Sequence, residues 1–487
     1  MAENIFKIAL ENPTIESLTQ ALYKVIDAYN NLAEENKNLV AKCEELEREN
    51  ERLRRQLNNN SKNSSKPSST DQKPSKASTE SKASNTYNSR EKSARKKGAQ
   101  KGHTGKGLTK EFAQELIDKR MAEHHIVCVG KKSDRYESRY VLDLKIRPTV
   151  TEFRFYRDKY ASYAIPADFN SPVTYGSNIK SICTLLYSEG VVSNDRIQSI
   201  INSLSGNVLS ISTGTVYNIC RSFVNASKSK YDSIVQRVLL SPVVATDATN
   251  ISIDGAQKYI RNFSLDACCL YESQEAKSIA CMNESAVLPN YEGTLIHDHE
   301  TALYHFGSEH GECNAHIFRY LQKNTEETKS QWSGEMKALL SEANRACKQA
   351  KLAESSVDEA YVAKVESKYD SILAKGWEEN KNTEGFTAEK EERRLLNRLK
   401  DYKKEHLLFL KDLRVPFTNN MSERDLRKCK NRQKISGGFR SVDGCDMYSK
   451  IMSVVETWKR EGKNLLEEMK QVFIASINLP CHAQAYL

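Results

Sequence analysis

The sequence lacks the spacing patterns that mark several protein classes. Twelve cysteines occur in 487 residues, but no CxxC pair is present, and the nearest arrangement is the adjacent pair Cys268 and Cys269. This excludes a disulfide-stapled scaffold and a finger-type zinc site, and scattered thiols are typical of a reducing compartment. No Gly-rich loop ending in Lys and Ser or Thr is present, which excludes a P-loop nucleotide site.

Long apolar runs are absent as well. No segment approaches the roughly 18 apolar residues of a membrane-spanning helix, and residues 1–14 lack the basic and then apolar pattern of a signal peptide. We therefore expect a cytoplasmic protein. A hydrophobic content of 39% in a chain of this length is enough for two or more domains, each with its own core.

Positive charge is concentrated in one low-complexity segment. Residues 58–110 hold thirteen Lys or Arg and three Asp or Glu, a net of +10, whereas the whole chain carries +9. This segment is rich in Ser, Lys and Asn, so we expect it to be disordered when free. We expect it to act as a solvated tether, to bind the backbone of a nucleic acid, or to do both. The residues that would contact phosphates are Arg90, Lys92, Arg95, Lys96, Lys97, Lys101 and Lys106.

A heptad repeat runs through residues 1–57. Its d positions are Val25, Leu32, Leu39, Leu46 and Leu53. Two of its a positions, Asn36 and Asn50, are asparagines, which fix register and favour two-stranded pairing. We expect a coiled coil through which the protein self-associates. The alternative is a single amphipathic helix packed on the chain's own globular body.

Residues 111–240 have a mixed and mainly helical pattern. Alternation over residues 140–156 suggests one or two strands. Ser193 is placed to cap a helix that runs to about Leu204, and Thr213 to cap a second helix over 215–226. Helix, turn and helix is the pattern of a helix-turn-helix, although most helical hairpins share it.

From Ser241 the pattern changes to short strands followed by helices. Predicted strands cover residues 242–246, 250–254, 258–269, 277–282 and 293–297, with a hairpin turn at Gly255. Beyond about Asn314 the chain is mostly helical until Pro416 breaks the pattern. A new helix then carries Glu423 in its first turn, and two closing helices cover about 445–460 and 463–474.

Three carboxylates stand where they could act on phosphates. Asp247 and Asp298 each end a short predicted strand, and Glu423 begins a helix. Carboxylates at neighbouring strand ends, with a third from a facing helix, can form an oxygen cage for two Mg²⁺ ions, with Mn²⁺ as a substitute. Two such ions activate the attacking oxygen and stabilise the leaving oxygen in phosphoryl displacement. The fallback carboxylates are Asp254, Asp266 and Asp425.

Histidines and a cysteine near Asp298 raise the alternative of zinc. His297 and His299 flank Asp298, but alternate residues of a strand face the opposite side from the residue between them, so Mg²⁺ stays the expected ion. Cys313 and His316 are spaced like half a zinc site. Without visible partners they are interpreted as a packed pair, with a role in holding DNA as the alternative.

Several motifs together resemble one family in order along the chain. The segments are 63–69 after the coiled coil, 95–103 in the basic region, 245–249 around Asp247, 297–298, the Cys-x-Ala-His element 313–316, and 415–424 with 432–441 around Glu423. They are similar to the insertion sequence sixty-six family of transposases, and the segment around Glu423 is the most specific of them.

This resemblance implies a multidomain α/β DNA transposase with an RNase H-like catalytic domain and a helical insertion between the second aspartate and the glutamate. The expected domains are a coiled coil over 1–57, a basic linker over 58–110, a DNA-binding region over 111–240, a catalytic domain over 241–440 with its insertion at about 317–415, and C-terminal helices over 441–487. Asp247, Asp298 and Glu423 are then the expected catalytic and metal-binding residues. No nucleotide cofactor is required, because strand transfer exchanges one phosphodiester for another.

A basic stretch follows the glutamate. It is either a solvated face or a grip on the DNA backbone beside the site of cleavage. Its members are Arg424, Arg427, Lys428, Lys430, Arg432 and Lys434. The expected partners are double-stranded DNA at element ends and targets, a second copy of the chain, and, left open, helper proteins of the same element; in a bacterial cell the protein would then associate with the nucleoid.

The chain departs from the family pattern at three places. Ala248 stands where the family has Glu after the first aspartate, and His299 where it has Gly after the second. The family's zinc module is degenerate here, with only Cys128 near two histidines, so no structural zinc is expected. Two other functions therefore remain open: a metal-dependent DNA nuclease without strand transfer, and a catalytically inactive DNA-binding scaffold.

Overall fold

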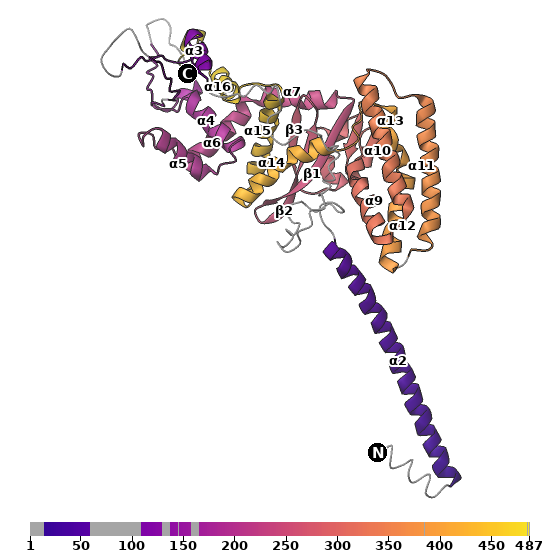
Figure 1. Ribbon diagram of the computed structural model, residues 1–487. Coiled ribbons are helices and arrows are strands. Elements are labelled where there is room, and N and C mark those ends of the chain that lie inside the picture. Colours follow the sequence, from indigo (N-terminus) through magenta and orange to yellow (C-terminus); the bar gives the residue numbers. More distant parts are fainter. Residues whose placement is uncertain are drawn as a thin grey trace. The chain divides into compact units, whose positions relative to one another are not determined.

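The computed structural model describes residues 14–58, 109–128, 137–144, 146–156, 165–383, 385–484 and 486 (Figure 1). These residues form a mixed α/β protein that divides into two compact units. We call residues 88–293 with 420–487 the hairpin unit, and residues 1–87 with 294–419 the helical unit. Each unit is therefore built from segments that are far apart in the sequence.

The hairpin unit contains an antiparallel meander of β1 (Val243–Ile253), β2 (Ala256–Ser264) and β3 (Cys269–Gln274). Asp254 and Gly255 join β1 to β2 with φ values of 49° and 75°, which is the geometry of a tight two-residue hairpin turn. The expected hairpin around Gly255 is confirmed. The expected strand over 277–282 is wrong, because Ser278 caps the short helix α8 there by accepting the Cys281 N–H at 3.3 Å.

Helices make up most of the rest of the hairpin unit. They are α3 (Lys110–Asp118), η2 (Ala167–Phe169), α4 (Ser177–Ser188), α5 (Asn194–Leu204), α6 (Thr213–Ala226), α7 (Lys228–Leu239), α8 (Ile279–Met282), η3 (Leu288–Asn290), α14 (Asn420–Ser436), α15 (Val442–Arg460), α16 (Leu465–Ala475) and α17 (Cys481–Gln484). Ser193 caps α5 as expected, whereas Ser212 rather than Thr213 caps α6. The described residues of 137–156 form no strand, and most of their side chains are exposed, so they offer no buried face for strand pairing.

The core of the hairpin unit joins its helices to the meander. Phe223 of α6 packs against Trp458 of α15 and Phe473 of α16, with ring centroids 6.1 and 5.7 Å apart. Helix α15 also bonds to β3, because the Tyr271 N–H donates to the Ser453 hydroxyl at 2.8 Å. Side chains of α15 thus form hydrogen bonds with backbone groups of β3 that are not paired with β2.

The helical unit contains two parallel strands, β4 (Thr294–His297) and β5 (Glu309–Glu312), and six helices of eight or more described residues. These helices are α2 (Ile15–Asn58), α9 (Asn314–Thr328), α10 (Gln331–Leu352), α11 (Glu359–Asn380), α12 (Phe386–Asp401) and α13 (Lys403–Lys411), and η4 (Thr301–His305) is a short turn. Helices α9 to α13 pack side by side (Figure 1). The expectation of helices between Asp298 and Glu423 is confirmed.

Close helix packing in this bundle depends on one glycine. A Cβ atom on Gly376 of α11 would lie 2.6 Å from a Leu396 methyl and 2.9 Å from the Trp332 ring. Trp332 is fully buried, which agrees with its expected packing role. Replacing Gly376 would therefore push apart three helices at a close contact.

The first described helix, α2, is continuous over 44 residues. All five apolar d positions of its heptad repeat are exposed, between 42% and 58%. Such a stripe is the surface that a coiled coil covers with a partner helix. Within the described residues, no helix is both long and apolar enough to cross a membrane.

Candidate active site

The first predicted carboxylate lies within a strand rather than at its end. Asp247 is half-buried in the middle of β1, because the strand continues to Ile253 where the sequence suggested a break. Its register partner on β2 is Asn262. The Asp247 N–H donates to the side-chain oxygen of Asn262 at 3.2 Å, in addition to the sheet pairing of the two strands.

Asn262 also fixes the start of the helix that carries the glutamate. Its fully buried side-chain amide donates to the Ser422 carbonyl at 3.1 Å, and the Ser422 hydroxyl donates back at 2.5 Å. Ser422 directly precedes Glu423, which lies in the first turn of α14 as expected. The hairpin unit therefore anchors the backbones next to Asp247 and Glu423 to one buried amide.

Sequence reasoning did not single out Asn262. The only signal was a polar amide inside the strand-forming run 259–263, where a buried polar side chain must find hydrogen-bond partners. Which partners it finds depends on Ser422, 160 positions away. That pairing is visible only in the folded chain.

Of the three fallback carboxylates, Asp425 is engaged in buried contacts, and the other two lie in turns. Asp425 is buried and accepts a 2.6 Å hydrogen bond from Ser264, and it pairs with Arg460 of α15. Asp254 lies in the hairpin turn. Asp266 lies in the turn between β2 and β3, not within a strand as expected.

The second predicted carboxylate stands at a strand end. Asp298 directly follows β4, as the sequence indicated. Because β4 and β5 are parallel and His297 pairs with Glu312, the residues that follow the two strands lie side by side. The Cys313 N–H continues this ladder by donating to the His297 carbonyl at 3.0 Å. Parallel pairing thus brings Asp298 next to Cys313.

Cys313 is the N-cap position of α9, and His316 lies in the first turn of that helix. Ligand atoms of Asp298, Cys313 and His316 lie within 4.8 Å of one another. The Asp298 carboxylate and the His316 ring nitrogen Nδ1 are 3.4 Å apart, and the two side chains are 20% and 13% exposed. Cys313 and His316 are therefore not merely a packed pair, because they share their surroundings with Asp298.

Charge and hydrogen bonding favour the ionised form of Asp298. Burial acts to raise its pKa, but hydrogen bonding to His316 and the charge of that ring outweigh burial, so the pKa of Asp298 lies below its usual value. The backbone N–H of Asn419 donates to the Cys313 sulfur at 3.1 Å, so Asn419 also contacts this cluster. A carboxylate, a thiol and an imidazole are all metal ligands.

His299 explains one departure from the family pattern. Its φ of 63° lies in the left-handed region that favours glycine. Its Nδ1 contacts the buried Glu312 carboxylate at 2.5 Å, and Tyr304 and Arg398 donate to the same carboxylate at 2.5 and 2.7 Å. These contacts fix the His299 side chain at a position where the family has glycine, which has no side chain.

The two histidines that flank Asp298 both contact one aromatic ring. His297 and His299 both contact the Tyr304 ring, with centroids 4.9 and 6.3 Å away, whereas Asp298 between them contacts His316. Burial acts to raise the pKa of Glu312, but hydrogen bonding to His299 and nearby positive charge hold it well below its usual value. Glu312 is thus an anion that positions the loop after β4.

Comparison with known families is decisive for the class of protein. The model of the Transposase IS66 family matches residues 175–447, more than half of the chain. The protein belongs to this family. A family of unknown function (DUF6444) matches residues 12–109, which include α2. A search of the curated proteins found no match.

Membership makes this chain a transposase, an enzyme that acts on DNA and binds it. The matched span contains Asp247, Asp298 and Glu423, so both clusters described above lie in the matched transposase region. It also contains the Cys313 and His316 pair. The basic residues of the linker, among them Arg95, Lys96, Lys97 and Lys101, lie outside the described residues.

The basic residues that follow Glu423 divide into two groups in this transposase. Arg424, Arg427 and Lys434 are exposed. The others bind other groups of the protein. Lys428 pairs with the buried Glu456, Lys430 donates to Asn250 at 2.6 and 2.9 Å, and Arg432 donates to the carbonyls of Tyr187 and Val192 at 3.3 and 3.1 Å. Arg432 is 7% exposed, and its role in DNA contact stays a prediction.

The transposase has two further features away from the carboxylates. Helices α5 and α6 are joined by residues 205–212, a longer connection than the turn of three or four residues in a helix-turn-helix, and base recognition by this pair stays a prediction.

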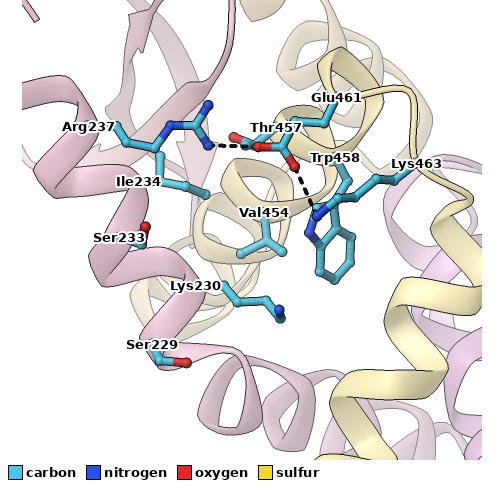
Figure 2. A pocket seen from close by; sticks show the side chains of 10 residues that line it. All are labelled: Ser229, Lys230, Ser233, Ile234, Arg237, Val454, Thr457, Trp458, Glu461 and Lys463. Atoms are coloured by element: carbon cyan, nitrogen blue, oxygen red, sulfur yellow. Dashed lines mark hydrogen bonds and ion pairs between the residues drawn. The ribbon is translucent and has the colours of Figure 1, made fainter.

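A cavity of about 220 Å³ lies between α7 and α15 (Figure 2). It is lined by Lys230, Arg237 and Glu461 among others, and none of the predicted catalytic carboxylates lines it.

Proposed function

We propose that this transposase cuts DNA at the ends of its element and joins the freed 3′-OH to target DNA, with Asp247, Asp298 and Glu423 as the ligands of two Mg²⁺ ions. Mn²⁺ would substitute for Mg²⁺ at oxygen ligands of this kind. The catalytic domain would have an RNase H-like fold, with α9 to α13 as the helical insertion between Asp298 and Glu423.

The single observation that carries the proposal is the buried amide of Asn262. It fixes the backbone beside Asp247 and the residue before Glu423, so two carboxylates from distant parts of the sequence are anchored to one point. The neighbouring Asp425 has a different task, because it already supplies the carboxylate that pairs with Arg460. A pair of acids held in this way supports a role as ligands.

The third ligand is supported by its own surroundings. Asp298 is ionised because its pKa is lowered, and it follows a buried strand whose residues are fixed by pairing to β5. A rigid strand end positions a carboxylate more accurately than a loop tip. Its position in the matched family region agrees with its place as the second aspartate.

Each protein group then has a defined task. Divalent ions bound to the three carboxylates would activate the attacking oxygen and stabilise the charge on the leaving oxygen. Exposed Arg424 and Arg427, in the first turns of α14, would hold the DNA backbone near Glu423. Cleavage by water would break one phosphodiester and release a 3′-OH and a 5′-phosphate. In joining, the 3′-OH would attack a target phosphodiester and a target 3′-OH would leave, so one phosphodiester is formed for the one that is broken and no nucleotide cofactor is consumed.

The departures from the family pattern do not favour an inactive scaffold. His299 is accommodated by Glu312, so the strand that leads to Asp298 is intact. Ala248 follows Asp247 in β1, and its side chain therefore faces the side of the strand opposite to Asp247. Neither substitution removes a proposed ligand.

The test is cleavage and joining on DNA that carries the element's own ends, with Mg²⁺ or Mn²⁺. We expect nicked and joined products from the wild type, and a decrease of at least about 1000-fold in Asp247→Asn and Glu423→Gln, because each removes a charge that compensates the metal. Exposed Glu284→Gln, in the same unit, serves as the matched carboxylate control and should leave both products unchanged.

Three outcomes separate the alternatives. Activity in both variants would overturn the ligand assignment. Nicked products without joined ones would favour a nuclease. A wild type that binds the ends but is inert with either ion would favour the scaffold.

A further inference from the structure

The cluster of Asp298, Cys313 and His316 contains two donors, a thiol and an imidazole, that the proposed Mg²⁺ chemistry does not use. Mg²⁺ takes oxygen ligands and keeps several of its waters, so a thiol and an imidazole contribute nothing to its binding. Thiolate and imidazole are instead the preferred ligands of Zn²⁺ and of Co²⁺. Two of the three donors therefore point to a different class of ion.

The backbone places these donors without distortion. Asp298 and Cys313 follow paired parallel strands, and His316 lies one helical turn beyond Cys313, so both helix donors face the same side of α9. Their ligand atoms already lie within 4.8 Å of one another. Ligands around one tetrahedral ion, each about 2.0–2.3 Å from it, are separated by distances that small side-chain rotations would reach from here.

The Cys313 sulfur has a fixed position. It accepts the Asn419 N–H at 3.1 Å, and Cys313 is the N-cap residue of the 15-residue helix α9. Asp298 and His316 are 20% and 13% exposed, so solvent reaches both side chains of the cluster.

We propose that Asp298, Cys313 and His316 form a binding site for a thiophilic divalent ion of the Zn²⁺ and Co²⁺ class. This inference shares Asp298 with the proposed function and rests on it only for the role of Asp298 as a metal ligand. Binding through Cys313 does not depend on strand transfer, so the two proposals can fail separately.

The test is titration of the full-length, reduced protein with Co²⁺ alone, followed by absorption spectroscopy. We expect a near-ultraviolet band from thiolate-to-Co²⁺ charge transfer and visible bands of a tetrahedral ion, with Zn²⁺ abolishing both by competition. In Cys313→Ser the charge-transfer band is expected to disappear, and Co²⁺ affinity to fall by more than about 100-fold, since even outer partners of metal ligands contribute 10–100-fold. His316→Gln is expected to weaken binding similarly.

Matched controls make the result specific. Cys128→Ser removes an exposed cysteine beside two histidines outside the cluster and is expected to leave the band unchanged. Thermal unfolding of each variant without metal distinguishes removal of a ligand from failure to fold. A band that follows Cys128, Co²⁺ binding without any thiolate band, or no binding at all would each overturn the proposal.

The proposed function is measured separately. Cleavage and joining with Mg²⁺ in the absence of Co²⁺ and Zn²⁺ would continue to support the three-carboxylate assignment, even where the thiolate site fails. A thiolate band in a protein that never joins strands would support the site and contradict strand transfer.

Discussion

At the scale of single residues, Glu392 is a buried carboxylate that joins the helices of the bundle. Its carboxylate is 1% exposed and accepts hydrogen bonds from side chains next to or within α9, α10 and α11, while Glu392 itself belongs to α12. The donors are Asn324 at 2.8 Å, Ser330 at 2.6 Å, Trp332 at 2.7 Å, Asn380 at 3.0 Å and Thr383 at 2.5 Å. One anion thus joins four helices that the chain connects only through loops.

The conservative variant Glu392→Gln is expected to destabilise the bundle by about 3 kcal/mol, because an amide turns a donor toward groups that are themselves donors. Urea unfolding followed by tryptophan fluorescence measures this change. Glu391→Gln is the matched control, since Glu391 forms a partly exposed ion pair with Lys323 and its replacement should cost less than about 1 kcal/mol. Equal effects of the two variants would contradict a special role for Glu392.

The same residue predicts a dependence on pH. Burial acts to raise the pKa of Glu392, but its hydrogen bonds prevail and the pKa lies below the ordinary value of 4.5. Its stabilising contribution is therefore complete above pH 4.5 and disappears as the pH falls through the lowered pKa. The difference in unfolding free energy between wild type and Glu392→Gln should shrink in acid and stay constant from about pH 6 to about pH 8.

At the scale of one element, α14 combines two functions on opposite faces. Its inner face holds Asp425 and Arg432, which bind other parts of the hairpin unit, and Arg432 also stacks over the Tyr187 ring at 4.4 Å. Its outer face presents Arg424, Arg427 and Lys434. Helical spacing alone does not tell which basic side chain takes which face, because charged residues surround the whole helix.

The outer face is expected to bind the DNA backbone. Changing Arg424, Arg427 and Lys434 to Gln should weaken binding of element ends and of unrelated DNA alike, because phosphate contacts carry no sequence information. The slope of log affinity against log salt should become shallower by roughly 0.9 for each phosphate that is no longer neutralised. Filter binding at several salt concentrations measures it.

The charge-matched control for this prediction lies in the helical unit. It changes exposed Lys348, Lys364 and Lys368 to Gln, so the net charge of the protein falls by the same amount. We expect this control to bind DNA nearly as the wild type does, because these lysines are not next to Glu423 in α14. An equal decrease in affinity there would point to a general effect of net charge rather than to α14.

At the scale of the whole molecule, we expect the exposed apolar stripe of α2 to be covered by a partner helix. Leu39 and Leu46 are each 55% exposed on a helix of 44 residues. An exposed seam with asparagine at two a positions fits a second copy of the same helix in a parallel pair. The protein would then act as a dimer, which is suited to hold two DNA ends.

Disrupting the seam is expected to dissociate the protein. Leu39→Lys with Leu46→Lys would place like charges in the helix contact, so the mass measured by sedimentation equilibrium should fall to that of one chain. Glu34→Lys with Ala41→Lys places two lysines on the outer f positions and should leave the mass unchanged. A wild type that sediments as a single chain would rule out the coiled coil.

The sequence by itself determined the class of protein and the local frame of the site. Motifs around Asp247, Asp298 and Glu423 indicated a transposase, and the family match bears this out. It also placed Asp298 after a strand, Glu423 in the first turn of a helix, and a helical segment between them. These features follow from hydrophobic periodicity, capping and turn residues, which act over a few positions and are therefore legible in the sequence.

Only the tertiary structure decided which side chains meet. Asn262 and Ser422 are 160 positions apart, and Cys313 lies beside Asp298 because two strands pair in parallel. Arg432 differs from exposed Arg427 in nothing that composition reveals, yet it is buried against backbone carbonyls. Such contacts depend on packing between distant segments, where burial obliges each polar group to find a partner that the local sequence does not specify.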